Sequence, residues 1–137
     1  MTKNNIFLII ILIAGGIFSL SQPADAALYE EISALELIQR IRDKSDNGYI
    51  ILDIRGKNQY TNGHIQGAIN IPLQELGYRY IELDKTKDII VYCDIGVQSK
   101  IACQILINVD FKDVYNLTGG LQEWPYALET NNGRVDL

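Results

Sequence analysis

The hydrophobic pattern of the chain switches repeatedly between two periods. An almost entirely apolar run, typical of a strand that is buried on both faces, occupies residues 49–53, and further strand-like runs lie at residues 88–92 and 113–117. Apolar residues at helical spacing occupy residues 34–41 and 100–108. Short apolar strands that alternate with helices favour right-handed crossovers, and therefore predict an α/β fold with a mainly parallel sheet.

Shorter segments complete the expected order of elements. Ser33 and Glu36 have capping-box spacing, which marks the start of the first helix. The chain becomes polar from Glu129 onward and is expected to fray there. The other expected elements are an edge strand at residues 28–32, a helical turn at 58–62, a short strand at 68–71, a mixed helical segment at 73–83 and a last short helix at 121–124.

The N-terminal segment has a separate pattern. Lys3 precedes an apolar run over residues 6–20, which is shorter than the about 20 residues that a membrane span needs. Residues 21–23 break the run, and Ala-Asp-Ala at residues 24–26 has the small-x-small pattern of a cleavage site. We expect a secretory signal peptide over residues 1–26 that is cut after Ala26, which would make the protein periplasmic or secreted. An uncleaved membrane anchor is the alternative.

The rest of the chain suits one compact domain, residues 27–128, followed by a polar tail, residues 129–137. The net charge of −5 and the lack of a Lys/Arg run argue against a nucleic-acid partner and against stable membrane association after cleavage. With one histidine and no cysteine pair at ligand spacing, the sequence does not support a metal site. We expect a monomer that needs no cofactor.

The chain has two cysteines, Cys93 and Cys103, one before and one inside the helix predicted at residues 100–108. At 1.5 Å rise per residue their Cα atoms should lie about 7 Å or more apart, which a disulfide does not readily bridge. An internal disulfide is therefore the less favoured alternative. Cys103 flanks an apolar helix stripe and is expected to be a small apolar filler, which leaves Cys93 as a free thiol.

Cys93 ends a predicted strand and opens a loop that leads into a helix. Gly96 lets the backbone turn through positive φ, and Ser99 is placed to cap the helix. The N–H groups of such a loop can converge on a thiolate, or on an anion bonded to it, and thereby lower the pKa of the thiol. The residues expected to form this substrate-binding cradle are Asp94, Ile95, Gly96, Val97, Gln98 and Ser99.

Two chemistries suit a thiolate in such a cradle. In sulfur transfer the thiolate takes up a sulfane sulfur, holds it as a persulfide and passes it to an acceptor. In phosphate-ester hydrolysis it forms a phosphocysteine, which usually requires an arginine at the end of the loop and a general acid. Gln98 and Ser99 stand where that arginine would be, and no general acid can be assigned. Sulfur transfer is therefore favoured.

Three motifs, in order and at ordinary spacing, resemble those of the rhodanese homology domain family. They are Leu52-Asp53-Ile54-Arg55 with Tyr60 and the run at residues 63–72; Val91-Tyr92-Cys93 leading into a loop with Gly96 and Ser99; and Thr118-Gly119-Gly120 with Trp124. The resemblance covers most of the chain after residue 26. A single exported domain with Gln98-Ser99 is most similar to the small periplasmic thiosulfate sulfurtransferases of the phage-shock type.

The resemblance implies a rhodanese-like α/β fold with a five-stranded, mostly parallel sheet flanked by helices on both faces. It implies that Cys93 is the catalytic nucleophile and carries the persulfide. The donor would be a small sulfur-containing anion such as thiosulfate, or a persulfide, and the acceptor cyanide or a thiol. Asp53 and His64 would be structural residues of the first motif, and Arg55 either structural or substrate-binding. A sulfur carrier or a binding module with little thiosulfate turnover is the alternative.

The loop departs from the family pattern in its charge. Many family loops carry arginine or lysine where this chain has Asp94 and Gln98, and Val97 is apolar. Since thiosulfate is a dianion, Asp94 should weaken its capture unless the carboxylate turns outward. Lys100 and Arg55 are the nearest candidate cations.

Overall fold

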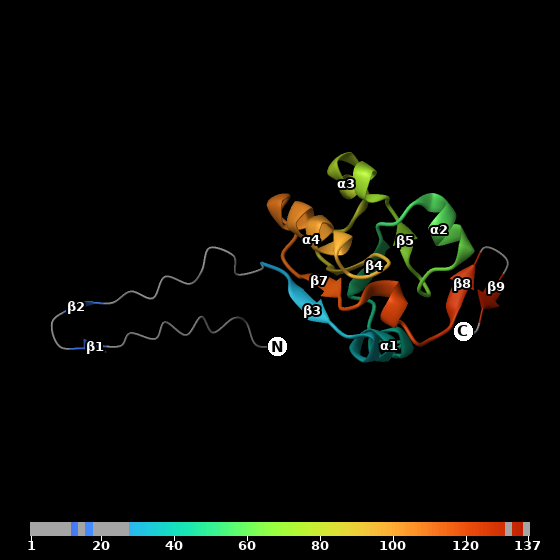
Figure 1. Ribbon diagram of the computed structural model, residues 1–137, viewed down its shortest axis with the longest axis horizontal. Helices are drawn as coiled ribbons and strands as arrows, with labels where there is room; N and C mark the ends of the chain where they lie inside the picture. The colour runs from blue at the N-terminus through green and yellow to red at the C-terminus, as the bar shows by residue number, and fades with distance from the viewer. Residues whose placement is uncertain (1–11, 14–15, 18–27, 131–132, 136–137) are drawn as a thin grey trace.

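The computed structural model describes residues 12–13, 16–17, 28–130 and 133–135. Five parallel strands form the central sheet in the order β3-β7-β6-β4-β5 (Figure 1). This confirms the predicted α/β fold with a parallel sheet. The strands are β3 (Glu30–Ile32), β4 (Tyr49–Asp53), β5 (Ile69–Asn70), β6 (Asp88–Tyr92) and β7 (Val114–Leu117).

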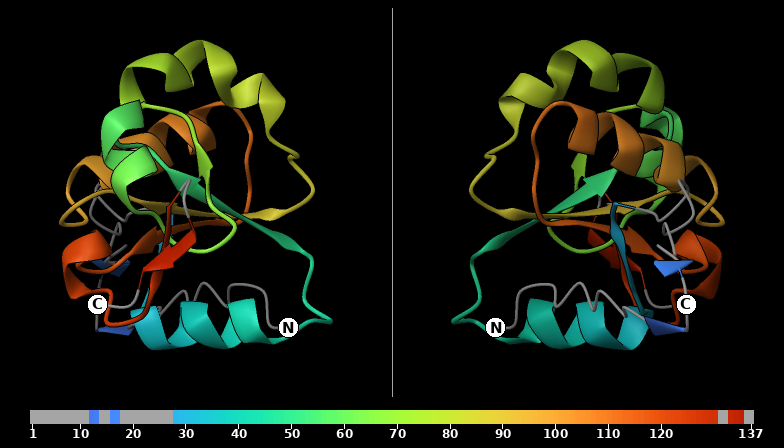
Figure 2. Two further views of the ribbon diagram at one scale, coloured as in Figure 1. Left: turned by 90° about the vertical axis from the view of Figure 1, so that its right-hand side faces the viewer. Right: turned by 90° about the vertical axis from the view of Figure 1, so that its left-hand side faces the viewer.

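Helices cover both faces of this sheet, with α1 on one side and α3 and α4 on the other (Figure 2). Side chains of β6 alternate between the two faces, as strand geometry requires: Ile89 and Val91 pack towards α4, whereas Ile90 and Tyr92 pack towards α1. The helical elements are α1 (Ala34–Arg42), α2 (Lys57–Asn62), α3 (Leu73–Arg79), η1 (Tyr80–Glu82), α4 (Gln98–Asn108) and η2 (Gly120–Glu123).

The start of α1 has the capping box that the sequence predicts. The Ser33 hydroxyl accepts from the Glu36 N–H at 3.2 Å, and the Ser33 N–H donates to Glu36 Oε2 at 2.8 Å. These bonds satisfy N–H groups that no helix carbonyl can reach. They fix the point at which the chain leaves β3 and crosses to the α1 face of the sheet.

The start of α4 differs from the expectation. The helix begins at Gln98, two residues earlier than predicted, and Val97 occupies the cap position without a side-chain hydrogen bond. The expected capping role of Ser99 is therefore wrong, because Ser99 already lies in the first helical turn. This places the Ser99 hydroxyl and N–H beside the preceding loop, where they bond to another group.

The C-terminal segment also differs, because the chain does not fray at Glu129. Strand β8 (Leu128–Thr130) pairs antiparallel with strand β9 (Gly133–Val135). Glu129 also exchanges two backbone hydrogen bonds with His64, at 2.8 and 2.9 Å. Backbone pairing of this kind is independent of side-chain polarity, so the polar composition of the segment gave no indication of it.

The predicted signal peptide lies largely outside the described residues. The part of it that is described consists of β1 (Leu12–Ile13) and β2 (Gly16–Ile17), which pair antiparallel. Among the described ranges, no helix has the length and apolar character needed to cross a bilayer.

Two leucines of α1 provide a test of this packing. Leu37 is fully buried between α1 and the sheet, whereas Leu35 is 59% exposed. We expect Leu37→Ala to lower the free energy of unfolding by about 2–5 kcal/mol and Leu35→Ala to change it by no more than about 0.5 kcal/mol. Urea denaturation measures both values. Equal losses in the two variants would contradict the placement of α1.

Candidate functional site

Cys93 follows β6, which lies between β4 and β7 in the sheet. Its sulfur accepts a hydrogen bond from the Gly96 N–H at 3.2 Å and lies 3.3 Å from the Ser99 hydroxyl. The residue is only 2% exposed. The predicted loop thus encloses the thiol, at the carboxyl end of a central strand, where α/β folds commonly place ligands.

The residues of the loop divide into two groups by exposure. Gly96 and Ser99 are buried with Cys93, and they supply the contacts to the sulfur. The exposed residues are Asp94, Ile95, Val97 and Gln98. Of these, Ile95 contributes its backbone N–H to the cradle. The predicted cradle is therefore made of backbone groups and one hydroxyl, with the exposed side chains around its outer surface.

The pKa of the Cys93 thiol lies below its ordinary value. Burial is the largest single influence and raises the pKa, because a buried thiolate loses hydration. The Ser99 hydroxyl and the N–H groups of Ser99, Ile95 and Gly96 together outweigh burial by donating to the sulfur. Since Ser99 lies in the first turn of α4, the positive end of the helix adds to this stabilisation. The donors of the loop therefore stabilise the thiolate in a site that is largely shielded from water.

The loop is held from behind by η2. The Leu121 N–H donates to the Cys93 carbonyl at 2.9 Å, and the Gln122 N–H donates to the Asp94 carbonyl at 2.8 Å. In a planar trans peptide the C=O and the following N–H point in opposite directions. The bond to the Asp94 carbonyl therefore turns the Ile95 N–H away from η2 and towards the sulfur.

Two glycines allow this close approach of the loop and η2. Gly96 has φ 78°, a left-handed conformation that lets the loop turn sharply. Gly120 has φ 58°, and a Cβ atom there would lie 2.5 Å from the Cys93 carbonyl oxygen and 2.7 Å from the Gly96 nitrogen. Only glycine fits at residue 120 without moving the loop.

Asn116 and Glu31 extend the support of the loop to the edge of the sheet. Asn116, only 1% exposed, donates from Nδ2 to Glu31 at 2.8 Å and to the Gly96 carbonyl at 3.4 Å. Thr118 donates to the same Glu31 oxygen at 3.0 Å. Sequence reasoning missed this network, although an asparagine inside an apolar strand was a usable signal.

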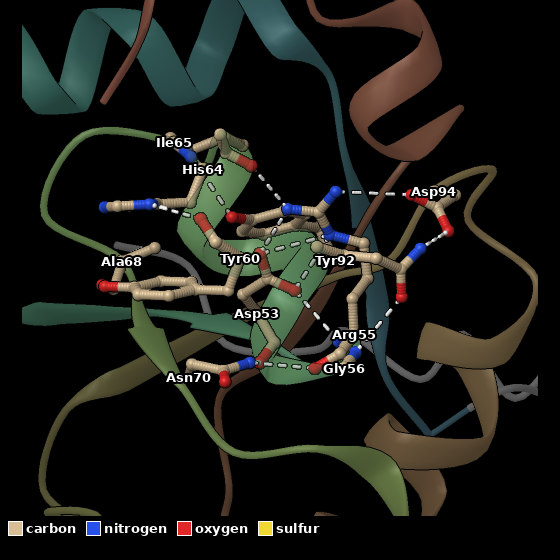
Figure 3. Close-up of polar contacts among 12 residues, drawn as sticks. Asp53, Arg55, Gly56, Tyr60, His64, Ile65, Ala68, Asn70, Tyr92 and Asp94 are labelled. Atoms are coloured by element: carbon tan, nitrogen blue, oxygen red, sulfur yellow. Dashed lines mark hydrogen bonds and ion pairs between the residues drawn. The ribbon is translucent and has the colours of Figure 1, made fainter. Parts of the chain in front are cut away.

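Asp53 and Arg55 form a buried ion pair beside the loop (Figure 3). Arg55 Nη2 lies 2.7 Å from Asp53 Oδ2 and donates to the Gly63 carbonyl at 2.7 Å. Burial lowers the pKa of Arg55, but the hydrogen bonds and charge of Asp53 raise it by more. The pKa of Arg55 is therefore above its ordinary value. The guanidinium is thus permanently charged, and most of its N–H groups donate to protein oxygens.

Asp94 turns its carboxylate towards α2 (Figure 3). Its Oδ1 lies 3.3 Å from Arg55 Nη1, and its Oδ2 accepts from the Gln59 amide at 2.9 Å. Lys100, the other candidate cation, lies 3.4 Å from Glu31. Both candidate cations are therefore paired with carboxylates, and the charge of Asp94 is partly neutralised.

His64 is engaged away from the thiolate contacts. Its Nδ1 lies 2.9 Å from the Tyr60 carbonyl oxygen, and its ring stacks on the Tyr60 ring with centroids 3.8 Å apart. Its backbone pairs with Glu129. These contacts tie α2 to β8.

Comparisons with known proteins agree with this arrangement. Residues 33–127 match the protein family described as "Rhodanese-like domain". The chain is 35% identical over 99 residues to thiosulfate sulfurtransferase GlpE of Shewanella oneidensis, covering 72% of this chain and 95% of that protein. It is 32% identical over 97 residues to a sulfurtransferase of Allochromatium vinosum, covering 71% and 89% respectively. The crystal structure of a rhodanese-related protein from Thermoplasma volcanium has a TM-score of 0.62 and 31% identity, covering 70% of this chain and 90% of that one.

The hydroxyl of Ser99 provides a test of the cradle. We expect Ser99→Ala to raise the pKa of Cys93, because a hydrogen bond to the thiolate is lost. The rate of alkylation by iodoacetamide at neutral pH should then fall several-fold, with its pH profile displaced upward. Ser45→Ala, which removes a hydroxyl bonded to Asp43, is the control and should leave the profile unchanged. An unaltered profile in Ser99→Ala would mean that the hydroxyl does not stabilise the thiolate.

Proposed function

Because the chain belongs to the rhodanese-like domain family, we propose that it is a sulfurtransferase that carries a sulfane sulfur as a persulfide on Cys93. The observation that carries this proposal is the set of donors on the sulfur: the Gly96 N–H at 3.2 Å and the Ser99 hydroxyl at 3.3 Å. A cradle of this kind stabilises both the attacking thiolate and the persulfide anion that replaces it.

The reaction divides into two displacements. In the first, the Cys93 thiolate attacks the outer sulfur of thiosulfate, the S–S bond of the donor breaks, and sulfite leaves with the bonding electron pair. In the second, cyanide or a thiolate attacks the outer sulfur of the persulfide and releases the Cys93 thiolate. Charge balances in each step, and neither step needs an oxidant or a metal. Burial of Cys93 at 2% exposure protects the intermediate from water.

A sulfur carrier with little turnover of free thiosulfate is the second candidate function. The charge around the loop favours it, because Arg55 and Lys100 are both paired with carboxylates. Phosphate-ester hydrolysis is not favoured, since Gln98 and Ser99 stand where an arginine would grip the phosphate.

We also propose that residues 1–26 are a signal peptide, that the rhodanese-like domain begins at residue 27, and that it acts in the periplasm or outside the cell. The support is the apolar run over residues 6–20 and the small-x-small pattern at residues 24–26. With Gln98-Ser99 in the loop, the chain would then be a sulfurtransferase of the periplasmic phage-shock type.

Intact-mass measurement tests the persulfide directly. The full chain is incubated with thiosulfate and, separately, with polysulfide under non-reducing conditions. We expect a gain of about 32 mass units, one sulfur atom, in the wild type and in Cys103→Ala, but none in Cys93→Ala. Cys103 is a fitting control because it is fully buried, with its pKa raised by burial to about 12. A chain that gains sulfur from neither donor, or that gains it in Cys93→Ala, would refute the proposal.

A further inference from the structure

Three large apolar side chains are exposed around the Cys93 cradle. Ile95 and Val97, on the loop, are 56% and 58% exposed, and Ile101, on α4, is 56% exposed. Val97 and Ile101 are four positions apart at the start of the helix, so they share a helix face. Single exposed apolar side chains are common on protein surfaces, but these three lie within eight residues of Cys93 in the sequence, on the loop and the helix that follow it.

Within residues 94–101 and at Arg55, each cationic side chain is paired with a carboxylate. Lys100 is the only cation among residues 94–101, and it pairs with Glu31. Arg55 is 6% exposed and contacts both Asp53 and Asp94. A dianionic donor would therefore approach Cys93 past a carboxylate and apolar side chains, with no unpaired cation in the loop to offset the repulsion between like charges.

We infer that this site exchanges sulfur with organic persulfides and thiols that carry an apolar group, and that Ile95, Val97 and Ile101 contact that group. The inference rests on the proposed persulfide chemistry of Cys93 and names its substrate class. The three side chains are then specificity-determining residues: they favour the organic donor by apolar contact, and they supply no positive charge to attract thiosulfate.

The chemistry of such a donor, R–S–SH, suits a site without cations. The Cys93 thiolate attacks the outer sulfur and forms a new S–S bond, and that sulfur keeps its hydrogen. The S–S bond of the donor breaks, and R–S⁻ leaves with the electron pair. One negative charge is present before and after the step, whereas thiosulfate brings two charges to the site in addition to that of the thiolate. The backbone donors to the sulfur can stabilise one charge without help from a side-chain cation.

The test compares two donors on charge-altered variants. Sulfur loading of Cys93 is followed by intact mass against time, with thiosulfate and with an alkyl persulfide whose alkyl group carries no charge, for the wild type, Ile95→Arg and Ile101→Arg. Because Ile101 lies in α4, its variant leaves the backbone of the loop intact. Ile81→Arg is the matched control, since Ile81 is an exposed isoleucine at 76% on η1, outside the loop.

We expect Ile95→Arg and Ile101→Arg to raise the ratio of thiosulfate loading to alkyl persulfide loading about tenfold at low salt. The thiosulfate gain should shrink at high salt, because ions screen exposed charges. Ile81→Arg should leave the ratio at the wild-type value. Ratios within twofold of the wild type in both loop-side variants, or an equal rise in Ile81→Arg, would overturn the inference while leaving persulfide formation on Cys93 intact. A wild type that is loaded by neither donor would refute the proposed function itself.

Discussion

The site depends on how the peptide groups after β6 are oriented. Two N–H groups of η2 bind the Cys93 and Asp94 carbonyls, at 2.9 and 2.8 Å, and thereby hold the carbonyl side of the loop away from the thiol. The second of these peptides then presents its opposite side, the Ile95 N–H, to the sulfur. This arrangement requires glycine at residue 120, where a side chain would lie 2.5 Å from the Cys93 carbonyl oxygen. The contact between η2 and the loop also links the site to the hydrophobic core. Trp124, which follows η2, is buried in the same cluster as side chains of α1.

Backbone dipoles therefore do the electrostatic work that side-chain cations perform in other anion sites. Arg55 stabilises the structure instead: it pairs with buried Asp53 and links the Gly63 turn to Asp94 of the loop. Dipoles that are fixed by the fold suit a small, singly charged sulfur anion, since they need no rearrangement when the charge appears. Because the loop has no unpaired cation, its attraction for a dianion is weak, and this links the geometry of the loop to the substrate class that we infer.

Local patterns predicted the elements that they control. The apolar run of β4 and the capping box at Ser33 depend on neighbouring residues, and both appear in the structure. The loop at Cys93 was predictable because a thiol, a glycine and a helix start are close in sequence. The contacts of η2 and β8 were not, because they join distant segments through backbone atoms that carry no side-chain signature. The orientation of Asp94 towards Arg55 was likewise beyond the sequence, since the two residues are 39 positions apart.

The most direct test of backbone stabilisation is the response of individual amides to the charge on Cys93. Nuclear magnetic resonance can follow the amide protons of Ile95 and Gly96 while the pH is raised through the titration of the thiol. If these N–H groups hold the sulfur anion, both resonances should move to lower field with the same midpoint as the Cys93 Cβ signal, and neither should titrate in Cys93→Ala. Amides that remain unchanged while the thiol of the wild type ionises would contradict the account.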